Sequence, residues 1–183
     1  MCGLCGQLSS GAPLKVCART YLDSKYLTDF TNFKESWEEV KMIIKGRCLC
    51  GKIHYEVTGP LNNADHCHCS MCRRQHGAAF ATYADFTPGD FIWTSGEDLV
   101  KTHETLSGDG WCFCSECGST LAGSNQGKVT TITLGTVEGD PGIKPEAHIF
   151  VGYRAQWHDI YDDLPQFEER PSNNGEPQPS SKK

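Results

Sequence analysis

The chain has 183 residues, and 38% of them are hydrophobic, which is enough to build one ordinary core. Its net charge of −6 at pH 7 excludes a nucleic-acid binder that relies on a basic face. No segment is long and apolar enough to cross a membrane, and residues 1–20 lack the apolar run of a secretory signal. We therefore expect a cytoplasmic protein that binds neither nucleic acid nor membrane.

Cysteine is the residue type that most needs an explanation, because the chain has eleven of them. Without a secretory signal, these thiols are expected to stay reduced, which favours metal binding or redox chemistry over a disulfide framework. Cys2 and Cys5 form a "CGLC" pair near the start, and Cys17 has no partner pattern. None of these three thiols indicates a defined site.

Residues 1–45 are expected to form an N-terminal extension that is partly helical. Within it, "NFKESWEEVKMII" (residues 32–44) has Asn32 as an N-cap and Glu35 at the third helical position. Apolar residues recur on one face of this predicted helix. The same residues also allow a switch from helix to strand near Met42.

From Gly46 onwards the sequence changes to short runs of β-branched and aromatic residues, which predict a mainly β domain over residues 46–165. "KIHYEV" alternates Ile53, Tyr55 and Val57, as a strand with one buried face does. "TGP", "TPGD", "SGDG" and "GDPG" supply turns between the runs. Residues 166–183 are polar, and we expect this tail to be disordered.

Three cysteine blocks stand in this β domain, and they read "RCLCGK", "HCHCSMC" and "WCFCSECGS". Zinc prefers thiolate and imidazole ligands in tetrahedral geometry, commonly as pairs a few residues apart. The economical partition joins the first block to the third in a closed, structural site of four thiolates, from Cys48, Cys50, Cys114 and Cys117. The second block then holds another zinc ion through Cys67, Cys69 and Cys72. Three protein ligands with one open position are typical of a catalytic zinc.

The fourth position of the second site has other candidates. His66, His68 and His76 lie close in sequence, and Cys112 is the remaining thiol of the third block. Spacing alone does not separate an open site from a site closed by one of these side chains. A histidine beside a metal site commonly orients the ligands instead of binding the metal.

The segments "GRCLCGKIHYEVTGP", "CHCSMCRRQHGAAF" and "FCSECGSTL" together resemble the signature of the glutathione-dependent formaldehyde-activating enzymes, also called the centromere protein V/GFA domain family. The resemblance covers about residues 46–165. It implies an Mss4-like (β-tent) fold of small antiparallel sheets with two zinc sites. It also implies that Cys48, Cys50, Cys114 and Cys117 bind a structural zinc, and that Cys67, Cys69 and Cys72 bind a catalytic zinc.

The resemblance also implies a reaction. The family is named for joining glutathione and formaldehyde into S-hydroxymethylglutathione, which is carbon–sulfur lyase chemistry in the addition direction. We expect formation or cleavage of such a thiol adduct, in detoxification or secondary metabolism, with zinc as cofactor and a small thiol such as glutathione as partner. The chain departs from the family where it reads "SGDGWCFC", because a basic residue commonly stands before that block. The departure bears on the substrate and not on the zinc ligands.

Arg73, Arg74 and Gln75 follow the last cysteine of the second block and are the predicted substrate contacts. Three thiolates on one zinc ion leave a net negative charge, which two arginines can offset. Guanidinium groups also bind carboxylates such as those of glutathione. The competing hypothesis is a non-catalytic zinc module that binds a protein partner, and a homo-oligomer is compatible with either. His148 and Asp162 fit no site pattern.

Overall fold

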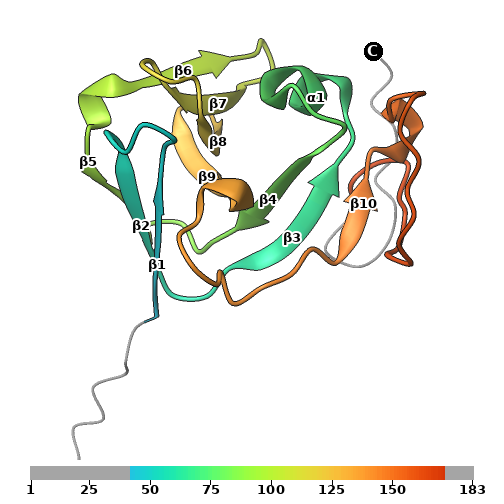
Figure 1. Cartoon of the computed structure of the whole chain (residues 1–183), viewed down its shortest axis with the longest axis horizontal. Coiled ribbons are helices and arrows are strands. Elements are labelled where there is room, and N and C mark those ends of the chain that lie inside the picture. Colours follow the sequence, from blue (N-terminus) through green and yellow to red (C-terminus); the bar gives the residue numbers. More distant parts are fainter. Residues whose placement is uncertain (1–41, 172–183) are drawn as a thin grey trace, which may run out of the picture. The chain divides into compact units, whose positions relative to one another are not determined.

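The structure is a computed structural model, and it describes residues 42–171. This part of the chain is mainly β, as the sequence predicts, with ten strands, one α-helix and three short 3₁₀ helices (Figure 1). The elements are β1 (Ile43–Arg47), β2 (His54–Thr58), β3 (Asn62–Cys67), α1 (Ser70–His76), β4 (Ala81–Asp85), β5 (Phe91–Ser95), η1 (Glu97–Leu99), β6 (Val100–Glu104), β7 (Asp109–Cys114), β8 (Thr120–Asn125), β9 (Lys128–Thr133), η2 (Leu134–Thr136), β10 (Ala147–Ile149) and η3 (Val151–Tyr153).

Part of the sequence interpretation lies outside the described residues. The helix expected over residues 32–44 falls there as far as residue 41, whereas Ile43 and Ile44 belong to β1, in agreement with the alternative of a strand near Met42. Cys2, Cys5 and Cys17 also lie outside the described residues, as does the tail from residue 172 onwards.

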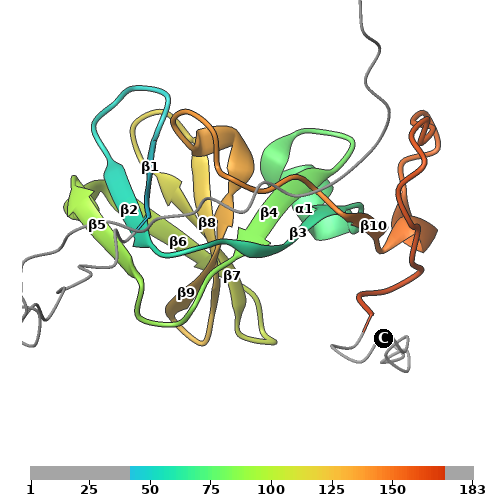
Figure 2. The same ribbon diagram turned by 90° about the horizontal axis from the view of Figure 1, so that it is seen from below.

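Two sheets make up the described domain. β1, β2 and β5 form an antiparallel sheet of three strands, in the order β1-β2-β5. The second sheet has seven strands in the order β10-β3-β4-β9-β8-β7-β6, and its pairs are antiparallel except for β10 beside β3. Figures 1 and 2 show the small sheet at one end of the domain and β10 at the other.

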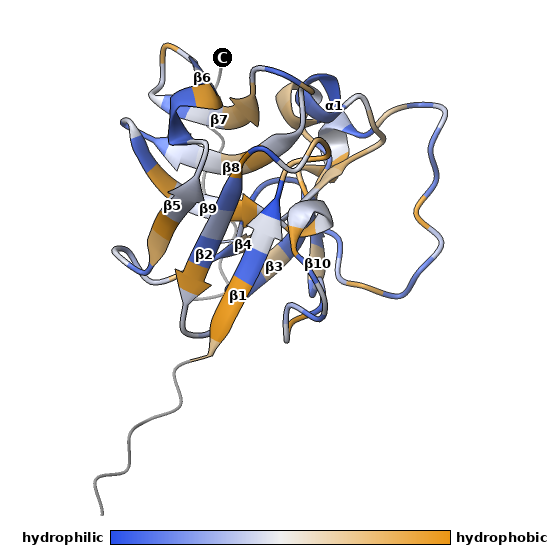
Figure 3. Ribbon diagram, turned by 60° about the vertical axis from the view of Figure 1, so that its left-hand side comes forward, coloured by the Kyte–Doolittle hydropathy of each residue, from blue (hydrophilic) through white to orange (hydrophobic). Residues whose placement is uncertain are grey.

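The main core lies between these sheets because alternate residues of the strands point inward. In β1 and β2 the buried residues include Ile44, Tyr55 and Val57, so the alternation read from "KIHYEV" is confirmed. Figure 3 shows the apolar ends of β1, β2 and β5 together. The Tyr55 hydroxyl pairs with Thr136 Oγ1 at 2.9 Å, which satisfies the polar atom of this buried ring.

A second, smaller core cluster forms where β3, β4, β7 and β10 meet α1. Its members include Cys67, Cys72, Tyr83, Trp111 and Ile149. Two thiols of the second cysteine block are therefore packed against aromatic rings. None of the helices in the described residues is both long and apolar enough to span a membrane.

The segment after η3 returns to the edge of the large sheet. His148 N–H donates to the Pro165 carbonyl, and Phe167 N–H donates to the His148 carbonyl, each at 2.8 Å. These bonds hold residues 165–167 beside β10. The segment then brings Arg170 to Asp85 at the end of β4, where the two charged groups lie 3.6 Å apart.

Candidate metal centres and substrate cavity

Four cysteines from distant parts of the chain form one group, which we call the four-thiol cluster (Cys48, Cys50, Cys114 and Cys117). Their sulfur atoms all lie within 4.8 Å of one another. Cys50 Sγ lies 3.4 Å from Cys48 Sγ and 3.8 Å from Cys114 Sγ. The cluster joins the β1–β2 turn to the turn that follows β7, so it links the small sheet to the large one.

Local backbone geometry holds these sulfur atoms in place. Cys48 N–H donates to the Ile53 carbonyl at 3.1 Å, and Ile53 N–H donates to Cys48 Sγ at 3.3 Å. In the other turn, Gly118 has φ of +74°, a conformation that favours glycine, and its N–H donates to the Cys114 carbonyl. Each turn therefore has backbone contacts of its own that position its thiols.

The Ser119 hydroxyl connects the two turns of the four-thiol cluster. It accepts a hydrogen bond from Leu49 N–H at 2.9 Å and lies 3.4 Å from Cys117 Sγ. The hydrogen bond with Ser119 lowers the pKa of the Cys117 thiol to about 6. This contact therefore favours the thiolate form of Cys117, which is the form that binds metal.

The donor set of the four-thiol cluster fits zinc. Sulfur atoms that each lie about 2.3 Å from a tetrahedral zinc ion are about 3.8 Å from one another. The separations of 3.4 and 3.8 Å in the cluster agree with this geometry. Four thiolates also make a closed site with no position left for a substrate.

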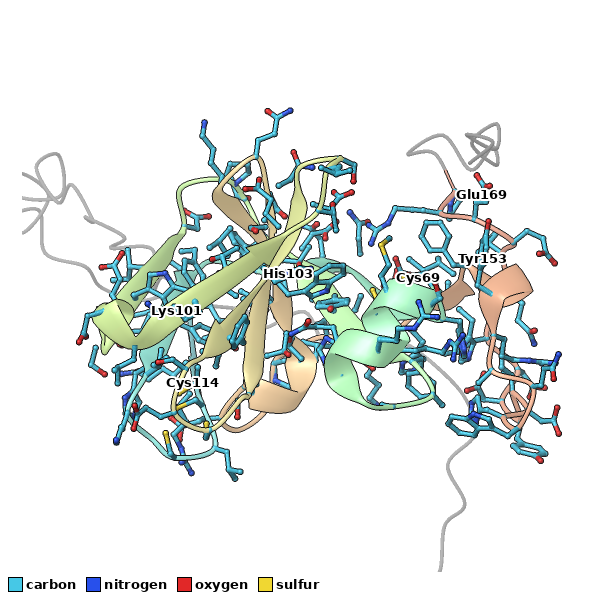
Figure 4. The ribbon with its side chains drawn as sticks, turned by 90° about the horizontal axis from the view of Figure 1, so that it is seen from above. Cys69, Lys101, His103, Cys114, Tyr153 and Glu169 are labelled. Carbon is cyan, nitrogen blue, oxygen red and sulfur yellow. The ribbon has the colours of Figure 1, made fainter. Side chains whose placement is uncertain are left out.

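The second cysteine block forms a separate group, the thiol triplet (Cys67, Cys69 and Cys72). Its three sulfur atoms also lie within 4.8 Å of one another. Cys67 ends β3, Cys69 is the N-cap residue of α1, and Cys72 lies in the first turn of that helix. Cys72 N–H donates to Cys69 Sγ at 3.3 Å, so the cap of α1 fixes the spacing of the thiols. Figure 4 shows Cys69 beside α1, well away from Cys114.

The electrostatics of the thiol triplet favour a bound cation. Hydrogen bonds from Cys67 and Cys72 hold the pKa of Cys69 far below its usual range. The same interactions, with Cys69 ionised, raise the pKa of Cys67 and of Cys72. Ionisation of one thiol therefore opposes ionisation of the other two, and a divalent cation among the three sulfur atoms would favour the thiolate form of all of them. Three thiolates at this spacing fit zinc as the four-thiol cluster does.

No fourth His, Cys, Asp or Glu ligand atom in residues 42–171 lies within 4.8 Å of all three triplet sulfurs. Each side chain considered for that position has another partner. His66 Nδ1 pairs with Thr82 Oγ1 at 2.9 Å, and His76 Nε2 pairs with the Tyr83 hydroxyl at 2.6 Å. His68 pairs with His148, and Cys112 Sγ lies 3.4 Å from Thr102 Oγ1.

A cavity of about 580 Å³ adjoins the thiol triplet, and Cys69 is one of its lining residues. This volume lies within the range of about 300–1,000 Å³ that is usual for small-molecule sites. Aromatic side chains, among them Tyr83, Trp111 and Phe150, form much of the wall near the triplet. The Tyr83 hydroxyl accepts a hydrogen bond from Trp111 Nε1 at 2.9 Å, and burial raises the pKa of Tyr83. This phenol therefore stays protonated and can donate to His76 Nε2.

The predicted substrate contacts lie on α1, and none of the three lines this cavity. The Nε atom of Arg73 is buried without a hydrogen-bond partner among the described residues, and Arg74 is exposed. Gln75 Nε2 donates to Thr120 Oγ1 at 3.3 Å. The cavity is lined instead by three charged residues that spacing had not indicated, which are Asp85, Asp109 and Arg170.

Three comparisons relate the chain to known proteins. A protein-family model described as glutathione-dependent formaldehyde-activating enzyme matches residues 43–153. A search of curated proteins found no significant match. Among solved structures, the crystal structure of a Rhodobacter sphaeroides protein is similar at 27% sequence identity, with a TM-score of 0.43, and the match covers 52% of this chain and 89% of that one.

Proposed function

The chain belongs to the glutathione-dependent formaldehyde-activating enzyme family, and on this premise we propose that it is a zinc-dependent carbon–sulfur lyase. Its reaction forms or breaks the bond between a thiol sulfur and the carbon of a small electrophile. With glutathione and formaldehyde, the thiol sulfur bonds to the carbonyl carbon, and the thiol proton passes to the carbonyl oxygen. The reverse reaction breaks the same bond and returns both reactants.

One observation carries this proposal. The thiol triplet offers three ligands, no fourth ligand atom in the described residues joins it, and Cys69 lines a cavity large enough for a small molecule. Three ligands beside a cavity suit a catalytic metal with a position left for a reactant. When bound there, zinc supplies positive charge that favours thiolates and polarises carbonyl oxygens.

The chain's own residues have separate parts in this proposal. The triplet holds the cofactor at the cavity wall, and Tyr83 and Trp111 exclude water from the buried side of the site. The four-thiol cluster holds a second, structural zinc ion. Two sheets joined by the four-thiol cluster also support the Mss4-like fold that the family resemblance implies.

The test is the substitution Cys69→Ser, with Cys112→Ser as the matched control, because both cysteines are largely enclosed but only Cys69 belongs to a cluster. Zinc content is measured together with the rate of adduct exchange between glutathione and formaldehyde, followed by NMR above the protein-free background. We expect Cys69→Ser to keep one zinc ion and lose the exchange, and Cys112→Ser to keep both zinc ions and the exchange. Two zinc ions per chain without any effect of thiols would instead support a non-catalytic zinc module.

A further inference from the structure

Tyr83 lies where the cavity and the thiol triplet meet. It lines the cavity and is 7% exposed, and it belongs to the same core cluster as Cys67 and Cys72. The strand register explains this position, because Ala81 pairs with Cys67 and Tyr83 follows two residues later on the same face of β4. Among the described residues, Tyr83 is the one member of this cluster that has a hydroxyl.

Two neighbouring side chains hold the Tyr83 hydroxyl in place. Trp111 Nε1 donates to it at 2.9 Å, and His76 Nε2 lies 2.6 Å from it. His76 and Cys72 are four residues apart in α1, so they share one face of the helix. Trp111 is 7% exposed, and the His76 ring meets the Tyr83 ring edge-on. Both partners are therefore packed, and the phenol oxygen has a fixed position beside the triplet.

The Tyr83 hydroxyl has one hydrogen-bonding position left. A phenol oxygen offers one hydrogen and two lone pairs, and the Trp111 indole can only donate, so it takes one lone pair. His76 takes the hydrogen if its Nε2 is unprotonated, or the second lone pair if its Nε2 carries a hydrogen. No third nitrogen or oxygen atom of residues 42–171 hydrogen-bonds this hydroxyl. In the second tautomer of His76, the phenol hydrogen itself is available to a ligand.

The proposed reaction supplies a partner for that hydrogen. When the thiol sulfur bonds to the carbonyl carbon, negative charge develops on the carbonyl oxygen. A hydrogen-bond donor already held in place stabilises such a charge. A carbonyl oxygen can only accept, so a bound carbonyl would select the tautomer in which His76 donates to Tyr83.

We propose that Tyr83 is a catalytic residue whose hydroxyl donates a hydrogen bond to the carbonyl oxygen of the electrophile, and that Trp111 and His76 are positioning residues that act through this hydroxyl. The inference rests on the proposed function, because it takes the cavity as the place where thiol and electrophile meet. Tyr83 keeps its proton in this role, so the thiol proton passes to the carbonyl oxygen as the reaction requires.

The substitution Tyr83→Phe removes the hydroxyl and keeps the ring. Its matched control is Tyr55→Phe, because Tyr55 is 0% exposed, bonds to Thr136 through its hydroxyl and does not line the cavity. Zinc content, glutathione binding by calorimetry and adduct exchange by NMR are measured on each full chain. We expect Tyr83→Phe to keep both zinc ions and its affinity for glutathione, and to lower the exchange rate by about 100-fold. Tyr55→Phe should keep all three properties.

The two positioning residues are tested alone and together with Tyr83→Phe. We expect Trp111→Phe and His76→Phe each to lower the exchange rate by about fivefold, the usual effect of one lost hydrogen bond. His76→Gln keeps a polar group at that place and should retain more of the rate than His76→Phe. In the Tyr83→Phe chain neither substitution should lower the rate further, because both act through the hydroxyl. Equal losses with and without the hydroxyl would show that these residues only support the fold.

Three outcomes would overturn the inference. If Tyr83→Phe keeps both zinc ions and the full exchange rate, Tyr83 is not catalytic and the lyase proposal stands. If Tyr83→Phe loses the zinc ion of the thiol triplet, Tyr83 supports the metal site instead. If the unchanged chain with two zinc ions neither binds glutathione nor exchanges the adduct above background, the proposed function fails, and the inference fails with it.

Discussion

His68 Nε2 lies 2.8 Å from His148 Nδ1, and His148 Nε2 lies 3.0 Å from Asp162 Oδ1. The two histidines are 0% and 2% exposed, so the first of these bonds is buried in the domain. His68 is the residue between Cys67 and Cys69. The hydrogen bonds that run from Asp162 through His148 therefore fix the part of the backbone that spaces two sulfur atoms of the thiol triplet.

We predict that His148→Ala weakens zinc binding at the thiol triplet by about 10- to 100-fold, the usual cost of losing a group that orients metal ligands. The substitution leaves His68 Nε2 without its partner, while His68 Nδ1 already has none in the described residues. Competition with a chelator, followed by the zinc content that remains, measures the change. Zinc in the four-thiol cluster should be retained.

The control for that prediction is His103→Ala, which removes an exposed imidazole of β6. Its zinc content should not change. If His148→Ala lowers the melting temperature and leaves zinc affinity intact, His148 serves packing alone and does not orient the ligands.

A matched pair of cysteines on β7 distinguishes a metal ligand from a buried thiol. Cys112 and Cys114 are 4% and 0% exposed, and only Cys114 belongs to the four-thiol cluster. We predict that Cys114→Ser loses the structural zinc and unfolds at a lower temperature, because the link between the two sheets is broken. Cys112→Ser should keep two zinc ions and cost about 1 kcal/mol. Elemental analysis and thermal melts check both, and equal losses would show that Cys114 is not a ligand.

The sequence predicts the grouping of sulfur atoms better than it predicts the cavity. Short spacings such as Cys114 to Cys117 bring two sulfurs together in one turn, whatever the rest of the chain does. The structure groups seven thiols as four and three. The alternation of buried and more exposed residues around Tyr55 could also be predicted, because a strand with one buried face places every second side chain in the core.

The cavity could not be predicted from the spacing of residues in the sequence, because its lining residues come from segments that lie far apart in the chain. Cys69 follows β3, Asp109 begins β7, and Arg170 comes from the segment that runs past β10. The pairing of His68 with His148 likewise joins residues that lie 80 positions apart. Among the segments quoted from the sequence, only "SGDGWCFC" pointed towards the cavity. Its departure from the family pattern falls on Asp109 and its neighbours.

Close packing around Gly46 leads to a prediction about stability. A Cβ at this position would overlap the ring of Tyr55, which is 0% exposed and cannot swing away. We predict that Gly46→Ala costs about 1–3 kcal/mol of unfolding free energy, as overpacking of a filled core usually does. Gly135→Ala is the control, because a Cβ there has no neighbour within 4 Å. Urea unfolding of both variants measures the difference in unfolding free energy. Equal stabilities would mean that the Tyr55 ring can move aside to accept the added methyl group.

Asp65 on β3 gives a prediction about pH. Burial raises the pKa of this carboxyl, and the charges of Asp85 and Glu146 raise it further, while Arg170 opposes them. A carboxyl whose pKa is higher in the folded state than in the unfolded state favours folding while it is protonated. That contribution is lost as the pH rises through the folded pKa. The ionised carboxylate therefore destabilises the native domain at neutral pH.

We accordingly predict that Asp65→Asn raises the melting temperature at about pH 8, where the carboxyl is ionised, and that the gain shrinks as the pH falls towards about 4. Asp98→Asn removes an exposed carboxylate and should show no such trend. Thermal melts of each variant against the unchanged chain across this range check the sign. A gain of the same size at every pH would assign the effect to packing of the amide, because only the ionised form of Asp65 carries the cost of burial.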